Sequence, residues 1–301
     1  MSDPTSVVAP TAESLATEAL TRAGLGRRAQ QEVFIKRVRQ EWIPEIMVDI
    51  RQKARLIRGD GLLSGLQTEA TTVVVTNQTR FIVPDEYEHD LQMWLLDGDS
   101  RDTATGGDAF DVNLSATESI SEVNAIGRYI LMLSGTSHGQ YRQITAYDEG
   151  TNTATVSHRW DTQQTPIAGD TYVIITRENK LEQQTTYDAE WDRVNRAPSE
   201  PTRFQMYNRE VELDLPPQKA YGLRFRYYAD PELIDYNDPK WVFLFRKYRR
   251  PLILGLMWTA MQDVDDDRAI NLEATYTTAV QQLISSELTT DDEAESFALM
   301  E

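Results

Sequence analysis

The feature of this sequence that most constrains its fold is a change in residue composition near residue 99. From Asp99 to Arg177 the chain is rich in Thr, Ser, Gly and β-branched residues and holds five strand-length runs separated by turn signals. Short strands at such spacing are typical of a small all-β sandwich or barrel. The runs are FDVNLS (110–115), RYILMLS (128–134), QYRQITAYD (140–148), TATVSHRW (153–160) and DTYVIIT (170–176). We therefore predict an antiparallel β-domain inserted at 99–177.

Helical periodicity dominates the two ends of the chain, where apolar residues recur about every 3.6 positions. Thr11 is a suitable N-cap for the first helix, and Pro239 fits the first turn of a later one. Pro44 and Pro251 fall inside two of the periodic runs and predict kinks or breaks there. The predicted helices span 11–25, 27–57, 238–264 and 267–288.

Strand-like alternation also occurs outside the predicted insert. Runs between residues 68 and 99 alternate like strands, and EVELDL (210–215) and LRFRYYA (223–229) flank the turn signal PPQKAYG, which predicts a β-hairpin. The predicted fold class is α+β, with a helical-bundle framework, one β-hairpin and an inserted small antiparallel β-sandwich or barrel. The framework spans 1–98 and 178–301, and the inserted β-domain spans 99–177.

The composition of the chain excludes several kinds of chemical site and binding partner. The chain of 301 residues has no cysteine, which excludes disulfides, cysteine nucleophiles and cysteine-ligated metals. Its net charge of −18 disfavours general binding to nucleic acid or anionic membranes. No apolar signal-peptide core is present near the N-terminus, and the longest apolar run, residues 251–261, is shorter than the ~20 residues of a membrane span. We expect a water-soluble, cytosolic product of a prokaryotic or viral genome without a membrane segment.

The stretch GTSHG (135–139) raises the question of a catalytic or phosphate-binding loop. A phosphate-binding loop needs four residues between its glycines and then Lys-Ser/Thr, whereas here three residues are enclosed and Gln140 follows. Ser137 and His138 are adjacent, so their side chains project in different directions and do not form a nucleophile–base couple. We predict a hairpin turn and no catalytic residue.

Metal ligation has weak support. The acidic stretch DVDDDRAI (263–270) alternates like a calcium loop, but Arg268 and Ala274 stand where such a loop requires Gly and Glu. We predict an acidic turn between two helices, no metal site and no cofactor. A hydrolase that uses paired carboxylates is a remaining alternative, because sequence alone does not place two acidic side chains across a cleft.

The segment 27–58 differs from the rest of the chain in charge. It holds nine cationic and four acidic residues, a net charge of +5 in a strongly acidic protein. Two interpretations stay open, a face that binds an acidic partner and an ordinary solvated helix face. The candidate interaction residues are Arg28, Lys36, Arg37, Arg39, Arg51 and Arg55.

The C-terminal tail TTDDEAESFALME (289–301) places acidic residues before an apolar FALM. We predict that it has no stable structure alone.

The order of these elements, together with several phrases, resembles the head-to-tail adaptor proteins, also called head-completion or gateway proteins, of the neck of tailed bacteriophages. The phrases are PTRF (201–204), VELDLPP (211–217) and YGLRFRYY (221–228). The insert is similar to small β-modules of phage structural proteins, through GQYRQITAYD, TATVSHRW and AGDTYVI. The resemblance covers about residues 10 to 290.

The resemblance implies a structural role in the virion. Such adaptors dock on the portal as a twelve-membered ring, extend the DNA channel and present a surface to a tail or nozzle protein. The genomic DNA passes through without sequence-specific binding. The tail would then order on docking against the portal or a neighbouring subunit, with Phe297, Leu299 and Met300 as anchors. We expect a monomer before assembly, because a charge of −18 opposes self-association.

One alternative is a virion surface protein that binds glycan through the β-insert, with Tyr141 and Trp160 as stacking platforms. Core packing is the other interpretation of these two aromatic residues. A cell-wall hydrolase is a further alternative with less support in the sequence.

Overall fold

The computed structural model of the protein describes residues 11–26, 32–58, 63–118, 120–161, 164–184 and 197–298, without the side chains of Val33, Arg58, Pro239 and 288–298. The chain divides into two compact units. The helical unit comprises Met1–Thr68, Asp85–His89 and Tyr228–Glu301. The sheet unit comprises Glu69–Pro84 and Asp90–Tyr227.

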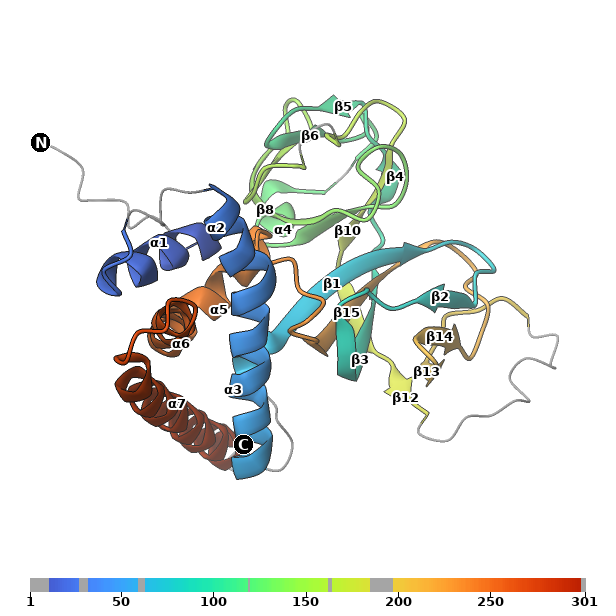
Figure 1. The fold of residues 1–301 in the computed structure, drawn as a ribbon. Helices are drawn as coiled ribbons and strands as arrows, with labels where there is room; N and C mark the ends of the chain where they lie inside the picture. Colours follow the sequence, from blue (N-terminus) through green and yellow to red (C-terminus); the bar gives the residue numbers. More distant parts are fainter. Residues whose placement is uncertain are drawn as a thin grey trace, which may run out of the picture. The chain divides into compact units, whose positions relative to one another are not determined.

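The helical unit is built around α6, which packs against α1, α3 and α7 (Figure 1). Gly255 of α6 allows a close approach to α3, because a Cβ atom there would lie 2.9 Å from the side chain of Ile46. The described helices are α1 (Ala12–Arg22), α2 (Glu32–Arg37), α3 (Ile43–Arg58), α5 (Val242–Lys247), α6 (Arg249–Gln262) and α7 (Ala269–Ala298). Shorter turns are the π-helical η2 (Val38–Trp42) and the 3-10 turns η3 (Ser64–Leu66) and η5 (Pro239–Trp241).

Helix α1 begins where its sequence predicts. The Thr11 side chain accepts a hydrogen bond from the Ser14 N–H, and the Ser14 hydroxyl accepts one from the Thr11 N–H, which satisfies two donors at the helix start. Its apolar stripe is buried in full: Ala12, Leu15, Ala16, Ala19 and Leu20.

Neither Pro44 nor Pro251 breaks the helix at its own position. The helix that contains Pro44 continues through it, because the π-helical turn η2 lets the Ile43 N–H donate to Val38 C=O, five residues back. Pro251 lies in the first turn of α6, where the missing N–H costs no helical hydrogen bond. The predicted helix 238–264 is therefore divided at Tyr248 into α5 and α6.

The sheet unit contains three sheets. The first has the order β1 (Gln67–Val74), β15 (Tyr221–Ala229), β3 (Tyr87–Asp97) and β11 (Arg177–Lys180). The second has the order β12 (Glu182–Gln183), β13 (Arg203–Tyr207), β14 (Glu210–Leu213) and β2 (Arg80–Ile82). The third has the order β4 (Arg101–Thr103), β10 (Thr171–Ile175), β7 (Tyr129–Met132), β8 (Tyr141–Asp148), β9 (Thr153–Val156), β6 (Asp111–Asn113) and β5 (Gly106–Gly107).

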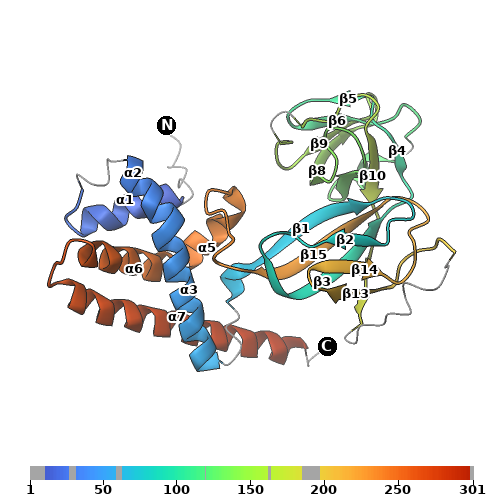
Figure 2. The same ribbon diagram turned by 45° about the vertical axis from the view of Figure 1, so that its right-hand side comes forward.

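The two four-stranded sheets form a sandwich, seen as neighbouring layers in Figure 2. Burial alternates along β15, where Leu223, Phe225 and Tyr227 are buried between half-exposed residues. Phe81 of β2 meets Phe225 of β15 with ring centroids 5.8 Å apart, which joins the layers. This alternation is expected for a strand with one face in a core.

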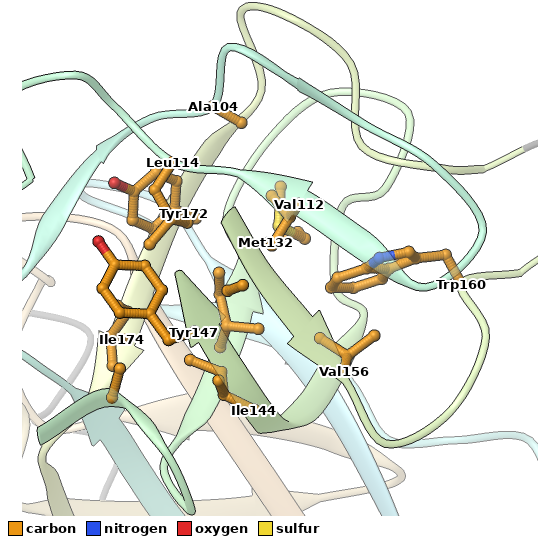
Figure 3. Packing of buried hydrophobic residues seen from close by; sticks show 13 residues of the cluster. Ala104, Val112, Leu114, Met132, Ile144, Tyr147, Val156, Trp160, Tyr172 and Ile174 are labelled. Carbon is orange, nitrogen blue, oxygen red and sulfur yellow. The ribbon is translucent and has the colours of Figure 1, made fainter. Parts of the chain in front are cut away.

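The seven-stranded sheet closes into a small barrel. Its edge strands β4 and β5 are separated by only Ala104 and Thr105, so one extended stretch pairs with β10 at one end and with β6 at the other. Between them the Ala104 N–H donates to Asp170 C=O and the Thr105 N–H to Asn113 C=O. The barrel interior holds its own hydrophobic core, which includes Trp160 and Tyr172 (Figure 3). A short helix, α4 (Glu122–Ala125), lies beside β8.

Apolar contacts fix the barrel to the first sheet. Leu131 and Val173 of the barrel pack with Val73 and Leu96 of the sheet. Gly222 of β15 makes this contact possible, because a Cβ atom there would lie 2.3 Å from Leu131. The barrel therefore belongs to the same packed body as the sandwich.

The predicted fold class is wrong. The described residues form three sheets of four, seven and four strands, so the chain is not a helical-bundle framework with one hairpin and a small insert. The strand runs on either side of the insert build a sandwich of their own. All seven barrel strands do lie within 99–177, and each of the five strand runs predicted there contains a strand.

The predicted hairpin between EVELDL and LRFRYYA is also wrong. Strands β14 and β15 lie in different sheets, and β14 pairs instead with β13 through a tight turn at Asn208 and Arg209. Both turn residues have positive φ, 47° and 69°, as a two-residue hairpin turn requires. Pro216 and Pro217 supply no N–H donors, so PPQKAYG crosses between the sheets.

Candidate assembly surfaces

The GTSHG stretch is the turn between β7 and β8, as predicted. Gly135 and Gly139 both have φ values near 80°, 82° and 81°, which favour glycine. The buried Ser137 hydroxyl donates to the Asp170 carboxylate at 2.8 Å, whereas His138 is exposed. Ser137 is therefore held by Asp170 as part of the turn and is not paired with His138.

The acidic stretch 263–270 forms the turn between α6 and α7. Asp263 pairs with Arg37 at 3.0 Å, and the carboxylate of Asp266 accepts from the side chain and backbone N–H of Arg268. These hydrogen bonds, the side-chain one first, lower the pKa of Asp266 to about 2. No group of three or more metal-binding side chains occurs among the described residues.

Three of the six residues of the predicted basic face are engaged within the chain. Arg37 pairs with Glu41 and Asp263, and Arg51 pairs with Glu88. The hydrogen bonds from Arg37 to Glu41 and then Asp263 raise the pKa of its guanidinium. Arg39 donates to the Asn237 side chain at 3.1 Å. Lys36 and Arg55 are exposed, and Arg28 lies outside the described residues.

A second cationic surface was not predicted, although the run FRKYRR (245–250) is its signal in the sequence. The α5–α6 basic surface comprises the exposed residues Phe243, Arg246, Arg249 and Arg250. Arg249 pairs with Glu18, and Arg250 donates to Gln282. Arg246 has no ion-pair partner within the described ranges. The cations of this surface lie on both sides of the break at Tyr248, Arg246 at the end of α5 and Arg249 and Arg250 at the start of α6.

A buried carboxylate, Glu287, holds together the elements that carry the α5–α6 basic surface. Glu287 of α7 is 3% exposed and accepts hydrogen bonds from Ser64 at 2.9 Å and Tyr248 at 2.8 Å. Lys247 lies 3.0 Å from the same carboxylate. Burial and then the Glu287 charge raise the pKa of Tyr248. This cluster joins η3, the α5–α6 break and α7, so the backbone that carries the cations is fixed.

An acidic groove runs along α3. Two adjoining hollows of about 460 and 340 Å³ share Gln40, Pro44 and Glu232. The α3 groove is lined between η2–α3 and residues 232–237. Its acidic side chains include Glu41, Glu45, Glu232 and Asp235, and two cations of the predicted basic face, Lys36 and Arg39, line its smaller hollow. Glu41 pairs with Arg37, whereas Glu45, Glu232 and Asp235 have no cationic partner in the part of the chain described.

The predicted C-terminal anchors are placed only in part. The backbone of α7 continues to Ala298, so Phe297 lies in a helix, whereas residues 289–301 were predicted to have no stable structure alone. Its side chain, and all of Leu299 and Met300, lie outside the described residues. The described buried face of α7 extends to Glu287.

The two aromatic residues considered for glycan stacking have different environments. Trp160 is 1% exposed and belongs to the barrel core, so stacking on a ligand is excluded for it (Figure 3). Tyr141 is half-buried, stacks on Tyr129 with centroids 4.5 Å apart and donates to Glu178. Burial and the Glu178 charge raise the pKa of Tyr141.

No protein-family model matches this chain, and no curated protein matches its sequence. Among the helices that the structure describes, none is long and apolar enough to cross a membrane.

Proposed function

We propose that this chain is a structural neck protein of a tailed bacteriophage. It docks on the portal as a twelve-membered ring, extends the DNA channel and connects the head to a tail or nozzle protein. It is assembled in the cytoplasm of the bacterial host and has no catalytic role. The proposal begins from the resemblance of the phrases in 201–228 and of the β-insert to phage adaptor proteins.

The observation that carries the proposal is the pair of oppositely charged surfaces on the helical unit. The α5–α6 basic surface presents Arg246 and Arg250, and the α3 groove presents Glu45, Glu232 and Asp235 without internal counter-ions among the described residues. Head-to-tail contacts between identical subunits join two different patches of the same chain, and patches of opposite charge complement each other in such a contact. Such contacts generate a ring when the rotation between subunits closes.

The net charge of −18 explains why assembly would need a template. Free subunits repel one another, and this repulsion opposes a ring in solution. Binding to the portal places subunits side by side, where short-range attraction between the two surfaces exceeds the long-range repulsion. The acidic surface also disfavours adhesion to the DNA that passes through the channel.

A charge-reversal experiment tests the two surfaces. One variant carries Arg246→Glu and Arg250→Glu, the other Glu45→Lys and Glu232→Lys, and each is mixed with the portal ring of the same phage. We expect each variant alone to bind with far fewer copies per portal than the wild type. An equal mixture should restore the full ring, because reversed surfaces match each other in alternating positions.

The matched control carries Glu13→Lys and Glu273→Lys, two exposed acidic residues outside the groove. It changes net charge by the same amount as the groove variant and should assemble like the wild type. Failure of the mixture to recover binding, with both variants folded, would contradict the assignment of these surfaces.

A further inference from the structure

The sheet unit contains an open polar cleft where the barrel meets the sandwich. Its volume is about 520 Å³, within the range of small-ligand sites. One wall is the edge strand β1 at residues 69–72 together with Arg224 of β15. The other wall is the β7–β8 turn and the start of β8, residues 138–142, with Asp161 and Gln164. We name this hollow the seam cleft.

The barrel wall of the seam cleft is held in place by hydrogen bonds. The Gln140 amide donates to Gln164 C=O at 2.7 Å and accepts from the Asp161 N–H at 2.9 Å. Arg142 donates to the Asp161 carboxylate at 2.9 Å. Polar groups fixed in this way lose little conformational freedom when a ligand binds, which lowers the entropic cost of binding.

The charges around the seam cleft are paired. Arg142 pairs with Asp161, Arg224 with Glu178 at 2.8 Å and Arg226 with Glu69 at 2.7 Å. A balanced lining gives no preference for an anion or a cation. Each ion pair still offers carboxylate acceptors and guanidinium donors beside one another, and a hydroxyl group both donates and accepts.

The remaining lining is also polar. Thr71 shares the cleft-facing side of β1, since Glu69 and Val73, two residues away on each side, both face the barrel side of the sheet. His138 is exposed at the turn, and the ring of Tyr141 is held by its stack on Tyr129. A lipid or other apolar ligand would separate the solvent-facing polar atoms of this lining from water and give no hydrogen bonds in return.

We infer that the seam cleft binds a neutral saccharide. The inference goes beyond the neck role and does not depend on it. It replaces the expected stacking on Trp160, which is a core residue, by a site that the barrel and strand β1 build jointly. Arg142, Asp161 and Thr71 are the residues expected to contact the sugar hydroxyls.

The test uses saturation-transfer NMR on the full chain with maltose, cellobiose, lactose and N,N′-diacetylchitobiose, and with sialyllactose as a charged comparison. We expect transfer to at least one neutral disaccharide. Thr71→Trp fills the cleft and should abolish the transfer, or weaken affinity by at least about tenfold. Arg142→Gln shortens the side chain and removes the guanidinium but keeps an amide donor, and should weaken affinity by about fivefold.

The control is Ala146→Trp, which adds the same bulk at an exposed position of β8 outside the cleft and should leave binding unchanged. Circular dichroism establishes that each variant is folded. The inference is overturned if none of the neutral disaccharides gives transfer, if only sialyllactose does, or if binding persists in the folded Thr71→Trp variant. Because no portal is present, a failure here is separate from a failure of ring assembly.

Discussion

At the residue scale, Asp97 is the most heavily engaged carboxylate among the described residues of the sheet unit. It is 1% exposed at the end of β3, beside the point where the chain enters the barrel. Arg177 lies 2.5 Å, Lys219 2.8 Å and Arg101 3.0 Å from its oxygens. Burial alone would raise its pKa, but the hydrogen bond from Lys219, the Gly98 N–H and the Arg101 charge lower the pKa below its ordinary value.

Asp97→Asn should lower the free energy of unfolding by about 2 kcal/mol or more, because three cations lose the negative charge that they share and one of its two acceptor oxygens. Urea denaturation at pH 7 measures this loss. Asp267→Asn, at an exposed position without a contact in the described structure, is the control and should change stability by less than about 0.5 kcal/mol.

The loss should depend on pH. A carboxylate whose folded pKa is depressed stabilises the fold above its unfolded pKa of about 3.9, and this contribution disappears as the pH falls through the folded value. The wild type should therefore lose stability more steeply than Asp97→Asn between pH 5 and pH 2. A constant difference between the two proteins across this interval would contradict the account.

The GTSHG turn provides a second contrast between neighbouring residues. Ser137→Ala removes a buried hydrogen bond to Asp170 and should cost about 1–2 kcal/mol, whereas His138→Ala, at an exposed site, should change stability by less than about 0.5 kcal/mol. Thermal denaturation of the two variants measures this. Equal losses of stability in the two variants would show that the Ser137–Asp170 hydrogen bond does not hold the turn in place.

At the element scale, local patterns identified most strands but not their partners. Strands β6 to β10 could be predicted because turn signals and alternation are local properties. The sandwich could not, since β14 pairs with β2 more than a hundred residues earlier and β15 with β1, and no local pattern encodes these pairings. The charge of the α5–α6 basic surface is visible in FRKYRR. The basic face was instead predicted at 27–58, where Arg37 and Arg51 prove to be paired within the chain.

Gly222 tests the packing of barrel on sheet. A Gly222→Val side chain would meet Leu131, and such overpacking should destabilise the sheet unit by about 1–3 kcal/mol. Gly26→Val serves as the control, because a Cβ atom at Gly26 meets nothing within 4 Å. Chemical denaturation compares them, and similar behaviour of both variants would argue against a close barrel–sheet contact.

The end of α7 is expected to act in assembly rather than in folding. Deletion of 289–301 leaves the described buried positions, which extend to Glu287, intact. The truncated chain should keep its melting temperature within about 2 °C but bind the portal ring at least about tenfold more weakly. Unchanged portal affinity would show that residues 289–301 do not contribute to docking.

At the scale of the whole molecule, the two compact units divide the proposed work. The helical unit carries the oppositely charged surfaces, and the sheet unit carries the barrel and the seam cleft. The resemblance to neck adaptors rests on phrases from strands β13 to β15, which encode packing rather than chemistry. Function at this scale could therefore be proposed from the sequence. Of the surfaces through which it would act, the sequence shows only the charge of FRKYRR, and the α3 groove is a property of the folded helical unit.

Native mass spectrometry of the chain, alone and mixed with the portal ring of the same phage, tests the central claim most directly. The account predicts a monomer alone, because the charge of −18 opposes self-association, and twelve copies on each portal ring in the mixture. A chain that stays monomeric in the presence of the portal, at concentrations well above those of assembly, would contradict the neck function.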